Sequence, residues 1–140
     1  MIARVAIAIV LFAALAAIAF WLERRKRTDA PPTPVGRPPE QLDRADFARP
    51  DAPWLVVLFT SASCTSCAGL YDKAKPLESD DVAVTEVEFT AHKELHDRYH
   101  VDAAPMTVVA DRAGVVQKSF VGAFGATELW TAVAELRETR

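Results

Sequence analysis

The distribution of apolar and polar positions divides the chain into three segments. Residues 5–22 form a run without any charged side chain, composed of Ala, Val, Ile, Leu, Phe and Trp. As a helix this run would measure roughly 27 Å, close to the thickness of the hydrocarbon core of a bilayer. We therefore predict a membrane-spanning helix, with residues 1–27 as a membrane anchor.

The charges that flank this run favour an uncleaved anchor and indicate its orientation. Arg4 precedes the run, whereas Arg24, Arg25, Lys26 and Arg27 follow it. A cleaved signal peptide has a shorter apolar core and carries its charges before that core. Because positive flanks tend to stay inside, we expect the following domain on the cytoplasmic face of the membrane, with the outer face as the alternative.

A proline-rich stretch separates the anchor from the rest of the chain. Residues 28–41 contain five prolines and show no hydrophobic periodicity. This composition is typical of an extended, semi-rigid spacer. We accordingly predict a linker at 28–41 and a folded domain at 42–140.

In the third segment, strand-like and helix-like patterns alternate. Short, β-rich apolar runs predict strands, and amphipathic stretches predict helices. The predicted strands are 54–59, 82–89, 106–110 and 115–121, with a turn at 111–114, and the predicted helices are 41–47, 67–75, 92–100 and 126–136. This order of elements predicts an α/β fold with a central mixed sheet and helices on both faces.

Composition and charge restrict the class of function. A length of 140 residues suits one domain with an appendage. The net charge of −3 gives no support to nucleic-acid binding. The chain has 2 cysteines, too few for a framework of disulfides.

Both cysteines stand in the motif C-T-S-C, where a predicted buried strand passes into a predicted helix. Free N–H groups and the dipole at a helix N-terminus stabilise an anion, so we expect Cys64 to ionise more readily than a free thiol. Cys67 comes one turn further along, and we expect it to be near enough to form a disulfide with Cys64 and to be the more buried of the two. A dithiol oxidoreductase needs this arrangement of an exposed nucleophile and a resolving thiol.

Three motifs together resemble the thioredoxin family. They are the strand-end C-T-S-C, the A-P-M-T of residues 104–107, and D-R-A-G-V-V-Q-K-S-F-V-G-A at 111–123. The resemblance covers about residues 42–136 and implies a thioredoxin-like fold. It also implies that Pro105 is cis, that Ala104 and Pro105 offer backbone pairing to an incoming peptide, and that Gly122 lets substrate approach.

The resemblance further implies a protein-disulfide oxidoreductase in which Cys64 attacks and Cys67 resolves. Its expected partners are protein disulfides and another redox protein, and no organic cofactor or metal is implied. Thr65 and Ser66 replace the usual Gly-Pro, and we expect their hydroxyls to donate hydrogen bonds to a Cys64 thiolate.

Other departures from the family concern proton transfer. Leu58 stands where thioredoxins bury an aspartate, and Ser63 stands where tryptophan is usual. The position of the lysine that usually partners this aspartate is Glu86. We hypothesise that Glu86, on the second predicted strand, replaces the missing proton acceptor from the opposite wall of the site; a partly exposed strand-end glutamate without a role is the alternative.

Two other classes of function stay open at this point. His92, His96 and His100 recur at intervals of four and would share one helix face, a spacing that can bind metal, with Cys64 and Cys67 as further ligands. Three solvated histidines on a polar face are the simpler interpretation. A redox-silent adaptor that keeps the fold and binds partners without turnover is the remaining alternative.

Overall fold

The computed structural model describes residues 14–18 and 36–139. The chain divides into two units, Met1–Pro34 and Val35–Arg140. Of the predicted membrane span, only residues 14–18 are described, and they are helical and exposed. Across the described residues no helix is long and apolar enough to cross a bilayer. The rest of the span and residues 28–35 of the predicted linker lie outside the described residues, so the anchor stays a prediction.

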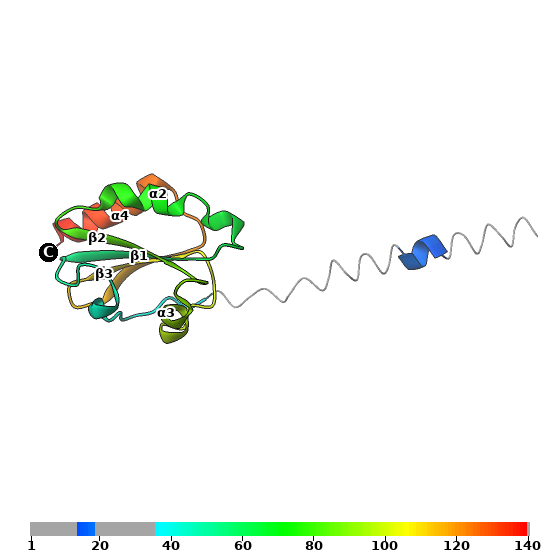
Figure 1. Ribbon diagram of the computed structural model, residues 1–140. Helices are drawn as coiled ribbons and strands as arrows, with labels where there is room; N and C mark the ends of the chain where they lie inside the picture. Colours follow the sequence, from blue (N-terminus) through cyan, green and yellow to red (C-terminus); the bar gives the residue numbers. More distant parts are fainter. Residues whose placement is uncertain (1–13, 19–35, 140) are drawn as a thin grey trace, which may run out of the picture. The chain divides into compact units, whose positions relative to one another are not determined.

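The second unit is built on a mixed sheet of four strands in the order β2-β1-β3-β4 (Figure 1). Strand β1 runs parallel to β2 and antiparallel to β3, and β3 and β4 form an antiparallel hairpin. The predicted mixed α/β sheet is therefore confirmed, and every strand boundary lies within one residue of its prediction. The strands are β1 (Trp54–Thr60), β2 (Val82–Glu88), β3 (Met106–Asp111) and β4 (Val116–Val121).

Helices cover both faces of this sheet. Figure 1 shows α2 and α4 on one face and α3 on the other. The α-helices are α2 (Leu70–Ala74), α3 (Lys93–Arg98) and α4 (Ala126–Glu138), and the 3-10 helices are η1 (Arg44–Asp46), η2 (Thr65–Cys67) and η3 (Lys75–Leu77). All seven side chains of β1 are buried, which explains its unbroken apolar sequence.

The two faces carry separate apolar layers. Val57 and Phe59 of β1 pack with Phe47 and Tyr99 in the layer beneath α3. The second layer, on the opposite face, lies under α2 and α4. There Leu58 packs among residues of the sheet and of both helices, which include Val56, Leu70, Ala74, Leu129 and Val133. The inward orientation predicted for the last helix is thus observed at Leu129 and Val133, and Leu136 is partly buried.

The predicted continuous helix at 67–75 is wrong. Gly69 adopts a left-handed conformation, with φ of 73°, and separates η2 from α2. The α-helix ends at Ala74, shortly before Pro76, which lies in the first turn of η3. Glycine adopts positive φ at little cost, and proline is tolerated in a first turn because the N–H it lacks has no partner there.

The predicted helix at 92–100 is shorter than expected. It extends over Lys93–Arg98 only, with His92 as its N-cap residue. His100 lies beyond the helix with φ of 53°. Histidine is among the residues that most often adopt this left-handed conformation.

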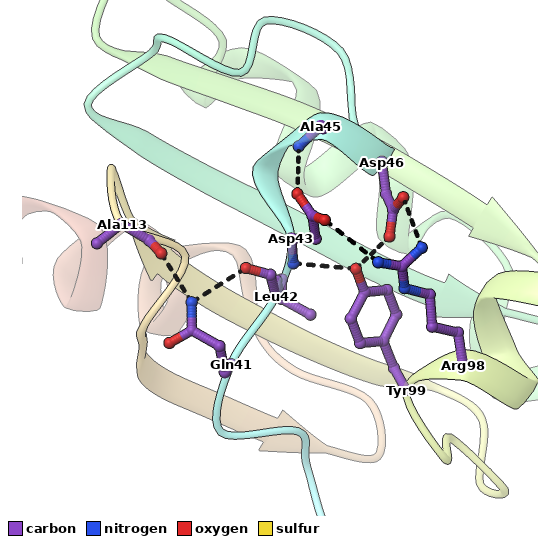
Figure 2. A network of polar contacts seen from close by, with 8 residues as sticks. All are labelled: Gln41, Leu42, Asp43, Ala45, Asp46, Arg98, Tyr99 and Ala113. Carbon is purple, nitrogen blue, oxygen red and sulfur yellow. Dashed lines mark hydrogen bonds and ion pairs between the residues drawn. The ribbon is translucent and has the colours of Figure 1, made fainter.

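A polar network attaches the segment before β1 to α3 (Figure 2). Tyr99 Oη accepts a hydrogen bond from Asp43 N at 3.0 Å and donates one to the Asp46 carboxylate. Arg98 forms ion pairs of 3.2 Å with both aspartates. Burial and the bond to Asp46 raise the pKa of Tyr99 to about 12.

The same segment is bound to the turn between β3 and β4. Leu42 N donates to Gly114 O at 2.8 Å. Figure 2 shows the bond from Gln41 Nε2 to Ala113 O, at 2.7 Å. Gly114 has φ of 83°, and a Cβ there would lie 2.0 Å from Leu42 O. Only glycine fits this contact.

Candidate active site

One end of the sheet brings together the ends of β1, β2 and β4 and the start of β3. Thr60 at the end of β1 lies beside Glu88 at the end of β2, since these strands are parallel. The start of β3 pairs with β1 through Phe59 and Met106, and Met106 also pairs with Val121 at the end of β4. Residues that follow β1 and β4, or that precede β3, therefore lie at this end of the sheet.

The motif residues predicted from the sequence lie in these connections. The C-T-S-C segment follows β1 closely, and the Ala104–Pro105 peptide bond immediately before β3 is cis. Gly122 follows β4 with φ of 94°, and its N–H donates to Pro105 O at 2.8 Å. Ala104 is exposed, whereas Pro105 is buried.

The two cysteines form a disulfide. Their Cα atoms are 5.4 Å apart, a usual separation for a disulfide. Two backbone turns shape the loop that holds the cysteines: Cys64 N donates to Ser61 O at 3.0 Å, and Cys67 N donates to Cys64 O at 3.2 Å. Cys64 is half-buried and Cys67 is 8% exposed, so the first cysteine is the more accessible one.

The local helix differs from the one expected to stabilise a Cys64 thiolate. Cys64 is the N-cap residue of η2, which has only three residues and is cut off from α2 by Gly69. A single 3-10 turn has a much smaller dipole than a continuous helix. The dipole therefore contributes less here than the sequence indicated.

Side-chain hydroxyls beside Cys64 provide a different polar contact. Ser66 Oγ lies 3.4 Å from Cys64 Sγ, within hydrogen-bond distance for sulfur. Thr65 is exposed, and among the described residues nothing bonds to its side chain. Of the two inner residues of the motif, Ser66 is the one in position to donate to a Cys64 thiolate.

Glu86 lies on the same face of the sheet as the buried position of Leu58, its partner in register. Its Oε1 accepts a hydrogen bond from Thr60 Oγ1 at 2.9 Å. Glu86 is exposed and, together with Cys64 and Cys67, lines a surface hollow of about 390 Å³. The structure thus brings a carboxylate and both cysteines into one hollow.

Glu88 also lines this hollow, and the sequence did not single it out. Its carboxylate accepts hydrogen bonds from Ala62 N at 3.1 Å and Ala91 N at 3.0 Å. Backbone hydrogen bonds from Thr90, Ala91 and Ala62 hold the pKa of Glu88 below its usual value. Glu88 therefore links the loop before Cys64 to the loop after β2, and an acidic residue at a strand end was the only sequence signal.

The structure does not support the histidine metal site. His96 is 3% exposed, lies between the rings of Phe59 and Phe89, and has Nε2 3.0 Å from Val87 O. His92 and His100 are exposed and lie outside α3, so the expectation of one shared polar face is wrong. Within residues 14–18 and 36–139, no cluster of three or more His, Cys, Asp or Glu side chains suits a metal ion.

Fold and site together define a thioredoxin-fold protein whose C-x-x-C motif, closed as a disulfide, lies at one end of the sheet. The sequence model of the family described as Thioredoxin matches residues 44–135, about two-thirds of the chain. The chain therefore belongs to the thioredoxin family, as its motifs indicated.

Solved thioredoxins have a similar structure. The germline-specific thioredoxin Deadhead of Drosophila melanogaster is 26% identical, with 62% of this chain and 84% of that one covered and a TM-score of 0.53. The thioredoxin of Fasciola hepatica is 25% identical, with 61% and 83% covered and a TM-score of 0.52. No curated protein matches the chain.

Proposed function

We propose that this protein is a thiol–disulfide oxidoreductase that acts on disulfides of other proteins through Cys64 and Cys67. The disulfide between these residues carries the proposal, because Cys64 is half-buried and Cys67 almost fully buried. A nucleophile has to reach its substrate, whereas a resolving thiol needs only to reach the nucleophile. The difference in burial fits these two roles.

In the reductive direction, the Cys64 thiolate attacks one sulfur of a substrate disulfide. A mixed disulfide forms, and the first substrate thiolate leaves and takes up a proton from solvent. Cys67 then loses its proton and attacks Cys64 Sγ, which forms the Cys64–Cys67 disulfide and releases the second substrate thiolate. Two electrons pass to the substrate, and another redox protein has to return them.

Glu86 is proposed as the group that accepts the Cys67 proton. It lines the same hollow as both cysteines, and the Thr60 hydroxyl holds its carboxylate at 2.9 Å. Leu58, at the position where the family has its buried acid, is fully buried and apolar and offers no such group.

The substrate groove is proposed to lie between the disulfide and the start of β3. Ala104 and Pro105 would offer backbone pairing to an extended peptide, and Gly122 leaves open space where a side chain would otherwise stand. Thr65 and Ser66 would contact the substrate from the other side, since both are exposed.

Redox titration of the full chain in detergent tests the activity. The protein is equilibrated in thiol/disulfide buffers of graded potential, free thiols are alkylated, and the mass is read. We expect one two-electron transition, near −270 mV for a reductase or nearer −120 mV for an oxidant. Cys67→Ser should trap mixed disulfides with protein substrates, and Cys64→Ser should not. Absence of a transition would leave the redox-silent adaptor as the function.

Glu86→Gln tests the proton acceptor. We expect slower disulfide exchange with a changed pH profile, because Cys67 loses its acceptor while the hydrogen bond from Thr60 is kept. Glu135→Gln, on the exposed side of α4, is the matched control. An unchanged rate at every pH would exclude Glu86 from this role.

Membrane attachment and its side are proposed from the sequence alone. The apolar run at 5–22 and the basic residues after it would hold the domain at the cytoplasmic face, near membrane-bound substrates. After alkaline washing, the protein should stay with the membrane. Protease added to right-side-out vesicles should leave the domain intact, and its digestion would place the domain outside.

A further inference from the structure

Strand β2 forms one edge of the sheet, and half of its main-chain groups point away from it. Trp54 N donates to Asp81 O, and Phe89 N donates to Thr60 O, each at 2.9 Å. Odd-numbered residues of this segment therefore face β1. Since the direction alternates along a strand, the N–H and C=O groups of the even-numbered residues face outward.

The protein covers this edge at its two ends. Val82 O accepts a hydrogen bond from Arg49 Nη1 at 3.3 Å. Glu88 O accepts one from His92 N at 2.9 Å. These contacts close the first and last outward-facing positions of β2 to an incoming chain.

The middle of the edge is open. Val84 and Glu86 are the remaining outward-facing residues, and in the described part of the chain no main-chain or side-chain group bonds to their N–H and C=O groups outside the sheet. The label β2 in Figure 1 marks this strand. An unpaired stretch of edge strand is a template to which another extended segment can add through main-chain hydrogen bonds.

Charge indicates what kind of segment fits. The only charged residues of β2 are Glu86 and Glu88, and neither forms an ion pair with a described basic side chain. Asp72 joins them in lining the adjoining hollow, which has no Lys or Arg in its lining. Lys93, just after β2, is paired with Asp97. Arg49 places a positive charge at the Val82 end of the edge, whereas the end with Glu86 and Glu88 presents open main-chain groups beside unpaired negative charge.

A second copy of the same strand does not fit this charge. Antiparallel pairing of two β2 edges through Val84 and Glu86 would make the Glu86 carboxylates of the two copies diagonal neighbours on one face, with no basic residue of β2 between them. Residues 28–140 also carry 18 Asp/Glu against 11 Lys/Arg, so two such domains repel each other. Self-association through this edge is therefore disfavoured.

We propose that the β2 edge docks an extended, basic segment of a partner protein, which adds to the sheet as a further strand beside Val84 and Glu86. Main-chain hydrogen bonds would supply affinity, and Lys or Arg side chains of the partner would meet the glutamates. This docking does not need the cysteines, so it extends beyond the redox function proposed above.

A short peptide of alternating Lys and Val tests the docking, with a Glu-Val peptide of equal length as its counterpart. We expect the Lys-Val peptide to bind the full chain in detergent about tenfold more tightly at low salt, and this difference to shrink at high salt. Binding should slow amide hydrogen exchange at Val84 and Glu86 but not along β4. A variant with Cys64→Ser and Cys67→Ser should bind equally, which separates this result from the redox assays.

Two further measurements distinguish strand addition from simple charge attraction. A Lys-Val peptide methylated at alternate amide nitrogens keeps its charge but cannot pair, and we expect it not to bind. Val84→Pro removes one outward N–H that takes no part in the β1 ladder, and should weaken binding of the unmethylated peptide. Equal binding of the methylated peptide, equal binding of both charge types, or a dimer with these amides already protected would each overturn the proposal.

Discussion

Reduction of the Cys64–Cys67 disulfide is expected to lower the free energy of unfolding. The bond closes a ring with a sequence separation of 3. Loop-closure entropy for so short a ring is about 6 cal/mol/K, so the oxidised form should be more stable by about 1.9 kcal/mol at room temperature. Folding and reduction form a thermodynamic cycle, so the same free energy also separates two reduction potentials. The reduction potential of the disulfide should be about 40 mV lower in the folded chain than in the unfolded chain.

Urea unfolding of both redox forms measures this difference. The full chain in detergent is unfolded once oxidised and once in excess dithiothreitol, with tryptophan fluorescence as the signal. We expect the midpoint of the reduced form to fall by roughly 1 M at an unchanged slope. In the variant with Cys64→Ser and Cys67→Ser, dithiothreitol should have no effect.

A reduced form as stable as the oxidised one, or more stable, would refute this reasoning. It would mean that the folded site stabilises the reduced pair by more than ring closure stabilises the oxidised pair. The contact between Ser66 Oγ and Cys64 Sγ, at 3.4 Å, is the feature that acts in this direction. Such a result would favour an oxidant over a reductant.

Three other substitutions probe the scaffold and the loop. Tyr99→Phe removes the bond to the Asp46 carboxylate and should cost about 2 kcal/mol in thermal unfolding. Because the pKa of Tyr99 is raised to about 12, wild-type stability should be complete below about pH 10 and fall as pH rises toward 12, and the variant should lack this fall. Gly114→Ala places a Cβ 2.0 Å from Leu42 O and should prevent stable folding, seen as lost near-UV circular dichroism. Because the folded pKa of Glu88 is lowered, its charge stabilises the wild type above the ordinary carboxyl pKa, and this contribution is lost as pH falls. Glu88→Gln should lack this contribution at every pH, so its stability should fall less in acid; an acid titration that matches wild type would contradict this.

The strands and the cysteine pair could be predicted because their signals are local. Alternating or continuous apolar runs follow from burial on one or both faces, and the observed boundaries agree within one residue. The break in the predicted helix at 67–75 was missed because residues on both sides of Gly69 are compatible with a helix. A single glycine inside a helical pattern has several outcomes, and the surrounding fold selected the left-handed one.

Contacts between distant segments account for what the sequence left open. His96 looked solvated among charged neighbours, yet packing of α3 against β2 places its ring between Phe59 and Phe89. Tyr99 and Arg98 meet Asp43 and Asp46 more than fifty positions away in the chain. No local pattern encodes such a meeting.

The amino-acid sequence by itself determined the strands and their order along the chain, the redox motif and the positions that flank it, because each depends on short-range periodicity or spacing. Only the tertiary structure showed that Glu88, which the sequence did not single out, also lines the hollow at the disulfide. Glu88 reaches Ala62 because β1 and β2 are parallel and end side by side at Thr60 and Glu88. Register between strands sets that contact, and register is fixed by packing across the whole sheet.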